Sequence, residues 1–469
     1  MEKLSVREKI MYGAGDLSGN IMFAAISFYL LYFFINVVGI NAFNASIIFI
    51  VARGWDAISD YLMGRIVDKT HSKWGKRRVY LLFGSLPFGM AFLLLWFNPF
   101  GMDANQLVKT IYFTGAYLIF NTTWTIVYIP YNALTVNMTK DYDERTSLNG
   151  YRIVMANIGI LLGAAIFSLL CEGTESILYG FFHDLNKAYA ISGVIFGTLA
   201  FVIMLLCALN VKERYEEDVL ENDKGFFRTL KEFFSLKEFR NISAYYLFSM
   251  IGFDVIMSLF IFLINDTLGF GGGATAMVFV AIPLLVAIGS SFFWVKLSEK
   301  MSKHKVYLIA VIEISLVLLT VLIIPEKNYI TTGLMCAGAG FGMSAIQILP
   351  FASLPDVCEV DEYVNGVRRE GAYYGITQFM YKLASGIAVA LASSILGAFG
   401  YIESTGATII EQPESALMAI RIVLALLPSI FFIISTIFAY RSHMSRDRFN
   451  EIKRELEKRK KCNSSSETK

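Results

Sequence analysis

The sequence predicts an all-α membrane protein with twelve transmembrane helices in two bundles of six. Of its 469 residues, 55% are hydrophobic and only 17% are charged, whereas soluble domains carry about 25% charged residues. Apolar runs of about twenty residues, the length that crosses a bilayer, recur along the whole chain. A single long charged stretch, residues 212–240, separates six such runs from six more.

These two sets of apolar runs define the predicted domains. Residues 1–211 form the first bundle, 212–240 a cytoplasmic linker, 241–440 the second bundle and 441–469 a cytoplasmic tail. The expected spans of the first bundle are 12–38, 43–67, 79–98, 107–138, 148–171 and 187–211. Those of the second are 241–265, 274–298, 305–325, 329–354, 371–400 and 415–440. Two sets of six helices around a central site are a common layout of membrane transporters.

The basic residues orient the predicted spans. An even number of spans puts both termini on one side of the membrane, and nearly all Lys and Arg residues outside the spans fall on that side. The loops of the other side carry only Lys109, Lys187 and Lys327. Because cytoplasmic loops are enriched in Lys and Arg, both termini are predicted to be cytoplasmic.

The composition argues against an enzyme, a zinc centre or a nucleic-acid-binding protein. Five cysteines and four histidines are scattered without metal-binding spacing, and the sequence shows no pairing of a nucleophile with a base and no phosphate-binding glycine loop. The formal net charge is only +2. We therefore expect no cofactor and no nucleic-acid partner. We also expect no cleavable signal peptide, because residues 1–10 are charged and polar.

Two acids in the second predicted span form the most informative pair. Val51–Arg78 reads VARGWDAISDYLMGRIVDKTHSKWGKRR, which places Asp56 and Asp60 four residues apart on one face of a helix. Ionisable groups inside a membrane are costly and commonly mark a function. Two carboxylates one turn apart repel, so a cation or a proton between them lowers the energy of the site. Because oxygen ligands suit hard ions, we predict a site for a coupling cation such as Na⁺.

Further polar residues fall inside the predicted spans. They are Asp16, Asn20, Thr125, Tyr128, Tyr131, Asn132, Arg152, Asp254, Glu313 and Lys382. Some have structural interpretations as well. For Asp16 the alternative to a role in the site is a helix cap or a gating ion pair, and for Asp254 and Glu313 it is a buried structural contact with another helix.

Four motifs in order along nearly the whole chain resemble one family. They are YGAGDLSGN (12–20), the segment Val51–Arg78, IPYNALTVNMT with DERTSLNGYR (129–152), and PDVCEVDEYVNGVRREGAYYGITQFMYKLASGIA (355–388). Together they resemble the glycoside–pentoside–hexuronide:cation symporters of the major facilitator superfamily. The resemblance implies two six-helix bundles, alternating access, and sugar uptake driven by Na⁺, Li⁺ or H⁺ across the inner membrane of a bacterium.

The resemblance also implies roles for individual residues. The implied cation site consists of Asp56, Asp60 and Thr125. The implied substrate site consists of Asp16, Asn20, Tyr128, Asn132, Arg152 and Lys382. We further predict a cytoplasmic gate of ion pairs, formed by Asp68, Lys69, Lys73, Arg77, Arg145 and Arg368.

Departures from the family pattern bear on the substrate. Where melibiose permease, a member of the family, has sugar-binding acids, this chain has Asn20 and Tyr128, so Arg152 and Lys382 are expected to carry surplus positive charge. The counter-charge that they need inside the protein comes either from Asp16, Asp56, Asp60 or Asp254, or from the substrate. An arginine grips a carboxylate or sulfonate with two parallel hydrogen bonds. We therefore predict an acidic sugar, such as a glucuronide, a hexuronide or a sulfo-sugar. A neutral glycoside or pentoside is the main alternative, and a lipid transporter of related fold is another.

Overall fold

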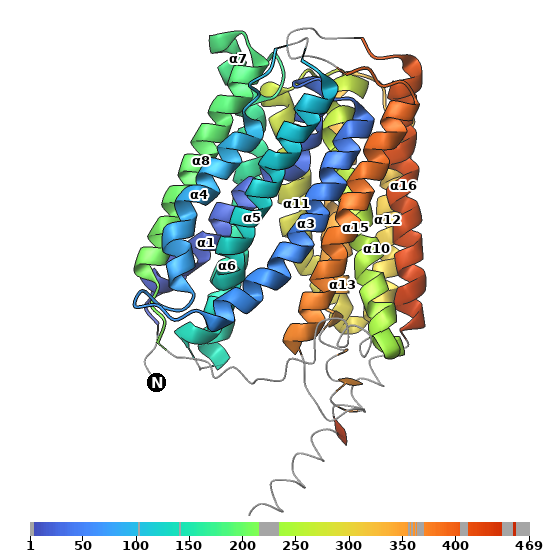
Figure 1. Cartoon of the computed structure of the whole chain (residues 1–469). Coiled ribbons are helices and arrows are strands. Elements are labelled where there is room, and N and C mark those ends of the chain that lie inside the picture. Colours follow the sequence, from blue (N-terminus) through green and yellow to red (C-terminus); the bar gives the residue numbers. More distant parts are fainter. Residues whose placement is uncertain are drawn as a thin grey trace, which may run out of the picture.

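The computed structural model of the protein describes residues 4–101, 104–139, 142–214, 234–354, 370–403 and 411–442, together with Val357, Val360, Asp361, Tyr363, Arg454 and Glu455. Within these residues the chain forms helices and connecting loops (Figure 1). The helices of the first half are α1 (Val6–Ala25), the π-helical turn η1 (Ile26–Leu30), α2 (Leu31–Asn36), α3 (Ala42–Lys69), α4 (Arg78–Trp96), α5 (Gln106–Met138), α6 (Tyr142–Cys171), α7 (Ile177–Phe182) and α8 (Leu185–Asn210). Those of the second half are α10 (Lys237–Phe262), the π-helical turn η2 (Leu263–Thr267), α11 (Gly273–Lys300), α12 (Lys303–Thr320), α13 (Tyr329–Phe351), α15 (Glu370–Ala398) and α16 (Glu414–Arg441).

Helices lie over all of the predicted spans, and α7 is an additional short helix between two of them. Among the described residues, nine helical segments are long and apolar enough to cross a membrane. The helices outside that group, α3, α5 and α12, carry more polar residues, with Asp56 and Asp60 among them. The prediction of an all-helical membrane protein is confirmed, while the number of spans and the side of the termini stay predictions.

Polar caps mark where several helices begin. Ser5 precedes α1, and its hydroxyl accepts a hydrogen bond from the backbone N–H of Glu8 at 3.2 Å. Asn41 precedes α3, and its side chain accepts one from the N–H of Asn44 at 2.8 Å. Each cap satisfies an N–H group that has no partner inside the helix, which favours starting the helix at that residue.

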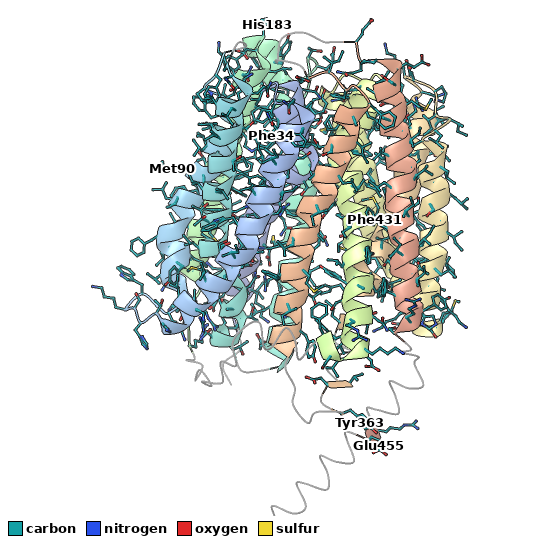
Figure 2. All side chains as sticks on the ribbon, turned by 45° about the vertical axis from the view of Figure 1, so that its right-hand side comes forward. Phe34, Met90, His183, Tyr363, Phe431 and Glu455 are labelled. Carbon is teal, nitrogen blue, oxygen red and sulfur yellow. The ribbon has the colours of Figure 1, made fainter. Side chains whose placement is uncertain are left out.

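The helices carry large apolar side chains on their outer surface as well as in the core. Met90 on α4 points away from the bundle and is 63% exposed, whereas Phe34 on α2 is fully buried (Figure 2). Many other large apolar side chains are exposed along the helices, among them Phe83, Phe292 and Leu334. An extensive apolar surface of this kind is expected where helices face lipid instead of water.

Small residues bring α1 and α6 into backbone contact. A Cβ atom added at Gly163 would lie 2.3 Å from the carbonyl oxygen of Ile21, and one added at Gly159 would lie 2.8 Å from that of Leu17. Glycines let helix backbones approach closely within membranes. This close packing sets α6 beside the polar face of α1, so that Arg152 can reach Asp16.

Hydrogen bonds between the two halves of the chain gather at one end of the molecule. Asn36 Nδ2 donates to Tyr401 Oη at 2.8 Å, Ser393 Oγ donates to the carbonyl of Ala42 at 2.7 Å, and the N–H of Gly273 donates to the carbonyl of Glu172 at 2.8 Å. This end lies opposite the N-terminus, and α3 and α15, adjacent in the middle, diverge toward the N-terminal end (Figure 1). The two groups of helices are therefore joined most firmly at the end far from the N-terminus.

Candidate functional site

The predicted cation-binding acids lie at the contact between the two halves. Lys382 on α15 reaches across to α3, where its ammonium group pairs with Asp56 Oδ2 at 3.0 Å and with Asp60 Oδ2. Asp56 is 3% exposed, so this pair lies in the interior. One ammonium group shared by two carboxylates links the halves of the chain by charge.

Further oxygen atoms surround these acids. Thr125 Oγ1 on α5 donates to Asp60 Oδ1 at 2.7 Å and lies 3.1 Å from the hydroxyl of Ser59. The second oxygen of Asp56 is buried and has no hydrogen-bond partner among the described residues. Carboxylate and hydroxyl oxygens around a single positive charge are the ligand set that a hard monovalent ion needs. The ammonium group of Lys382 supplies that charge in this conformation.

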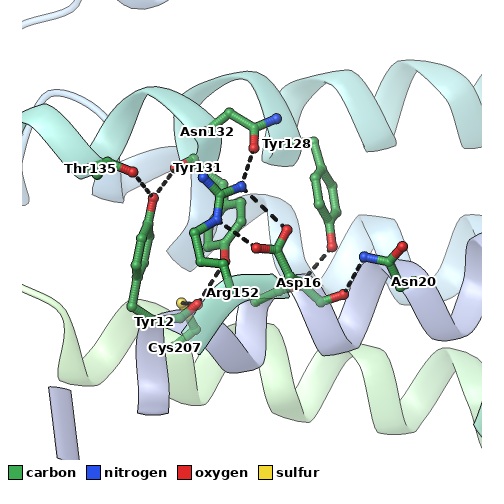
Figure 3. A network of polar contacts seen from close by, with 10 residues as sticks. Tyr12, Asp16, Asn20, Tyr128, Tyr131, Asn132, Thr135, Arg152 and Cys207 are labelled. Carbon is green, nitrogen blue, oxygen red and sulfur yellow. Dashed lines mark hydrogen bonds and ion pairs between the residues drawn. The ribbon is translucent and has the colours of Figure 1, made fainter. Parts of the chain in front are cut away.

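A second charged cluster lies within the first half of the chain (Figure 3). Arg152 on α6 donates from Nε to Asp16 Oδ2 at 2.5 Å and from Nη2 to Asp16 Oδ1 at 3.3 Å. The same Nη2 donates to Asn132 Oδ1 at 2.5 Å. The guanidinium carbon lies 4.9 Å from the ring centre of Tyr131, close enough for a cation–π interaction. Arg152 is therefore held by a two-pronged ion pair, an amide and an aromatic ring.

Two tyrosines of α5 pack into gaps that glycines leave on α1. Tyr128 Oη donates to the carbonyl of Gly15 at 2.6 Å, and Tyr131 Oη donates to that of Tyr12 at 2.7 Å. A Cβ atom added at Gly19 would lie 1.7 Å from the hydroxyl oxygen of Tyr128, and one at Gly15 would lie 2.3 Å from the ring of Tyr131. Gly15 and Gly19 were not among the residues predicted to form the site, although their four-residue spacing on either side of Asp16 indicated a close helix contact.

The hydrogen bonds change the interpretation of three predicted substrate residues. Asn20 Nδ2 donates to the carbonyl of Asp16 at 2.8 Å, and the hydroxyl of Tyr128 is committed to Gly15. Only Asn132 remains exposed, with its amide nitrogen available beside Arg152 (Figure 3). In this conformation, therefore, the hydroxyl of Tyr128 links α5 to α1, while the amide of Asn20 is bonded within α1. The assignment of both residues to the substrate site stays a prediction.

The expected surplus of positive charge is not found. Arg152 has a carboxylate partner in Asp16, and Lys382 has two, Asp56 and Asp60. The argument for an acidic substrate from unpaired cations therefore loses its basis in this conformation. The physical reason is that Arg152 and Lys382 are neutralised by acids far from them in the sequence, namely Asp16, Asp56 and Asp60. The positions of Asn20 and Tyr128, where acids were missing, are not needed for that.

The predicted gate residues are only partly described. Arg77 is buried, and its guanidinium donates to the carbonyl of Ala133 and to Asn137 Oδ1, both on α5. The side chains of Lys69 and Lys73 are exposed. The side chains of Asp68 and Arg145, and the whole of Arg368, lie outside the described residues, so the gate stays a prediction.

A charged centre between two groups of apolar helices is the arrangement of a secondary membrane transporter. The chain belongs to the MFS/sugar transport protein family, whose model matches residues 11–446. The resemblance to sugar:cation symporters of the major facilitator superfamily is thereby confirmed, and the protein is a transmembrane symporter of the sugar and glycoside type.

Three relatives illustrate the range of the family. A candidate glycoside/cation symporter of Escherichia coli, YagG, is 25% identical and is matched over 92% of this chain and 90% of its own. A candidate sulfoquinovose importer of Escherichia coli is 27% identical over 100% and 97% of the two chains. The sodium-dependent lysophosphatidylcholine symporter 1 of Gallus gallus is 25% identical over 100% and 92%.

A solved structure shares the fold. A bacterial homologue of the human lysosomal transporter Spinster superimposes with a TM-score of 0.66 over 94% of this chain and 96% of its own, at 12% identity. At that identity the likeness concerns the fold alone.

Proposed function

We propose that this chain is a cation-coupled symporter that imports a glycoside by alternating access across a bacterial cytoplasmic membrane. The observation that carries the proposal is the ammonium group of Lys382 between Asp56 and Asp60. A coupling ion, Na⁺, Li⁺ or H⁺, that binds between the Oδ2 atoms of these two acids has to displace Lys382. Because Lys382 belongs to the other half of the chain, ion binding changes a contact on which the conformational change depends.

The proposed topology has twelve spans in two six-helix bundles, with both termini in the cytoplasm. The distribution of Lys and Arg supports this orientation. With the N-terminus inside, the hydrogen bonds that join the two halves lie on the external side. The described conformation is then closed to the outside.

For the substrate we favour a neutral glycoside, which reverses the preference drawn from the sequence. The two charged clusters and the contact between the halves hold four carboxylates (Asp16, Asp56, Asp60 and Asp254) and three basic groups (Arg53, Arg152 and Lys382). In their ionised forms these groups carry one net negative charge, and one coupling cation neutralises it. A neutral sugar then binds without adding a charge that would have to be buried without a partner.

An acidic sugar is the second candidate. The relative named as a candidate sulfoquinovose importer supports it, since sulfoquinovose carries a sulfonate. The guanidinium of Arg152 donates two hydrogen bonds to the carboxylate of Asp16, and a substrate carboxylate or sulfonate that displaced Asp16 would accept the same two bonds. A lipid substrate has the support of one relative named as a lysophosphatidylcholine symporter.

Transport by purified protein in proteoliposomes separates these candidates. Labelled methyl glycosides, glucuronides, sulfoquinovose and lysophosphatidylcholine would each be offered with and without Na⁺ or Li⁺, at two pH values. We expect accumulation of a neutral glycoside that requires a cation gradient. Accumulation of sulfoquinovose or a glucuronide alone would favour the second candidate, and accumulation of the lipid alone would contradict the proposal.

A further inference from the structure

We infer that a cavity between Arg53 and Asp254 receives one hydroxyl group of the transported glycoside. Neither residue forms an ion pair of the two clusters described above, although Arg53 lies near enough to Asp56 and Asp254 to be attracted by their charges. The inference rests on the proposed function and extends it to a site for part of the substrate.

The cavity lies between the two halves of the chain. Ser27 and Arg53 line it from the first half, and Asp254, Ser258 and Ser385 line it from the second. Arg53 precedes Asp56 by three residues on α3, and Ser385 follows Lys382 by three on α15. On both helices the cavity is therefore about one turn from the ammonium group of Lys382, toward the closed end.

Two buried polar atoms that lack hydrogen bonds belong to residues lining this cavity. Arg53 Nε and Asp254 Oδ2 are both buried, and neither has a hydrogen-bond partner among the described residues. Asp254 is only 7% exposed, and its other oxygen accepts a hydrogen bond from Tyr381 Oη at 3.2 Å. Buried polar atoms without partners are rare in folded proteins, because each loses its hydrogen bonds to water. Such a pair at one cavity indicates a missing polar group.

The chemistry of the two atoms selects that group. Arg53 Nε–H is a donor and needs an acceptor, whereas the carboxylate oxygen of Asp254 is an acceptor and needs a donor. A hydroxyl group is both at once. A carboxylate or sulfonate only accepts, and an ammonium group only donates, so each would satisfy one partner and be repelled by the other.

The size of the cavity agrees with a single hydroxyl oxygen. Its volume is about 20 Å³, which is enough for one water molecule. Close packing at Gly386, where an added Cβ atom would lie 2.7 Å from Cβ of Arg53, brings α15 against the base of this side chain. A hydroxyl group bound here replaces a water molecule and bridges Arg53 on α3 to Asp254 on α10. The substrate thereby helps to hold the two halves together.

Competition with deoxy sugars tests the inference. The probes are the methyl glycosides of glucose, galactose and xylose, each with its single-deoxy analogues, tested for inhibition of the uptake of the labelled parent glycoside. In the wild-type protein we expect loss of one particular hydroxyl to weaken binding tenfold or more, because it leaves a buried charge unpaired. In Asp254→Asn the parent should bind at least tenfold more weakly, and that same deoxy analogue should no longer be distinguished from it.

Two further variants and a control complete the design. Arg53→Lys keeps the positive charge but loses the donor at Nε. Ser385→Ala is a milder change in the cavity lining, with a smaller risk that the variant misfolds. Both variants should show a smaller difference in affinity between the parent glycoside and the same deoxy analogue. Glu313→Gln removes a membrane acid from α12, outside the cavity lining, and should leave the deoxy profile unchanged.

The outcomes separate the inference from the proposed function. Equal discrimination of all deoxy analogues in the wild-type protein and in Asp254→Asn would overturn the inference, and would mean that the cavity holds an ordered water only. If the wild-type protein transports none of the glycosides, the proposed function itself fails and the inference fails with it.

Discussion

At the scale of single residues, the side chain of Lys382 occupies the place that a coupling cation would need. Its ammonium group lies 3.0 Å from Asp56 Oδ2 and also pairs with Asp60. Two carboxylates that share one positive charge are stable, but without that charge they repel each other. The proposed function therefore implies that Lys382 and the coupling ion compete for one site.

This competition predicts the behaviour of Lys382→Gln. The variant should unfold at a lower temperature than the wild-type protein in a buffer without Na⁺ or Li⁺, because two acids then face each other alone. At a hundred times its Kd for the variant, the coupling ion should stabilise the variant by about 2.7 kcal/mol, and it should stabilise the wild type by less. Thermal unfolding in detergent, with choline replacing Na⁺ as the control, measures the difference. An unfolding temperature that responds to neither alkali ions nor pH would contradict the competition.

The ion pair of Arg152 and Asp16 gives a second prediction for stability. Both side chains are largely buried, with 17% and 12% exposure. Removing one partner of a buried pair typically costs about 3–5 kcal/mol, because the other charge is left alone. Arg152→Gln and Asp16→Asn should each destabilise the protein, and the double variant should cost less than the sum of the two. Strict additivity in thermal unfolding would show that the pair is not coupled.

Whether a contact between two side chains could be predicted from the sequence depended on how far apart the two residues lie in the chain. The pairing of Asp56 with Asp60 was predictable because helical spacing puts positions i and i+4 on one face. The partner of Asp60, Lys382, is 322 positions away, and that of Asp16, Arg152, is 136 away. No local pattern encodes such contacts, so the sequence indicated which acids and bases lie in the predicted spans but left open whether Asp16, Asp56, Asp60, Asp254 or the substrate pairs with the two cations.

At the scale of helices, apolar length predicted almost every element. Helices cover all the predicted spans because runs of about twenty apolar residues have no other stable form in lipid. The short α7 was missed because six residues are too few for a periodic signal. The π-helical turns η1 and η2 were missed because they depend on packing with other helices.

The contact between α1 and α5 is tested by adding one methyl group. Gly19→Ala should destabilise the protein by about 1–3 kcal/mol, because the new Cβ atom would collide with the hydroxyl of Tyr128. Tyr128→Phe in the same chain should recover part of that loss. Gly54→Ala on α3 is the matched control, since no heavy atom lies within 4 Å of its added Cβ. Equal effects of the two alanines would argue against this packing.

At the scale of the whole molecule, a buried acid lies at the closed end of the transporter. Glu172 follows directly after α6, is fully buried, and accepts hydrogen bonds from Ser168 and from Asn265 on η2. Burial raises the pKa of Glu172 from its ordinary 4.5 to about 7. The carboxylate of Asp266 nearby acts in the same direction. When the halves separate, Glu172 meets water and its pKa returns toward the ordinary value.

This change predicts that external pH shifts the conformational balance. The closed state binds a proton at Glu172 more tightly than the open state does. The resulting stabilisation of the closed state relative to the open state is therefore fully present below about pH 4.5, and it is lost as the pH rises from there through about 7. Spin labels at Phe181 and Phe399, both exposed near this end, should report a longer average distance at pH 8 than at pH 5. Glu172→Gln should reduce the dependence on pH. A wild-type distance that does not change with pH would refute this role.

The most direct test of the central claim is to record cation entry driven by sugar. Proteoliposomes without an ion gradient would receive an inward gradient of the transported methyl glycoside, and internal Na⁺ and pH would be followed with fluorescent indicators. We predict that the wild-type protein shows cation entry together with sugar. Asp56→Asn and Asp60→Asn should lose this cation entry and accumulate no sugar against a gradient, while exchange of labelled sugar across the membrane persists in them. Undiminished cation entry in both variants would contradict the assignment of Asp56 and Asp60 as the coupling site.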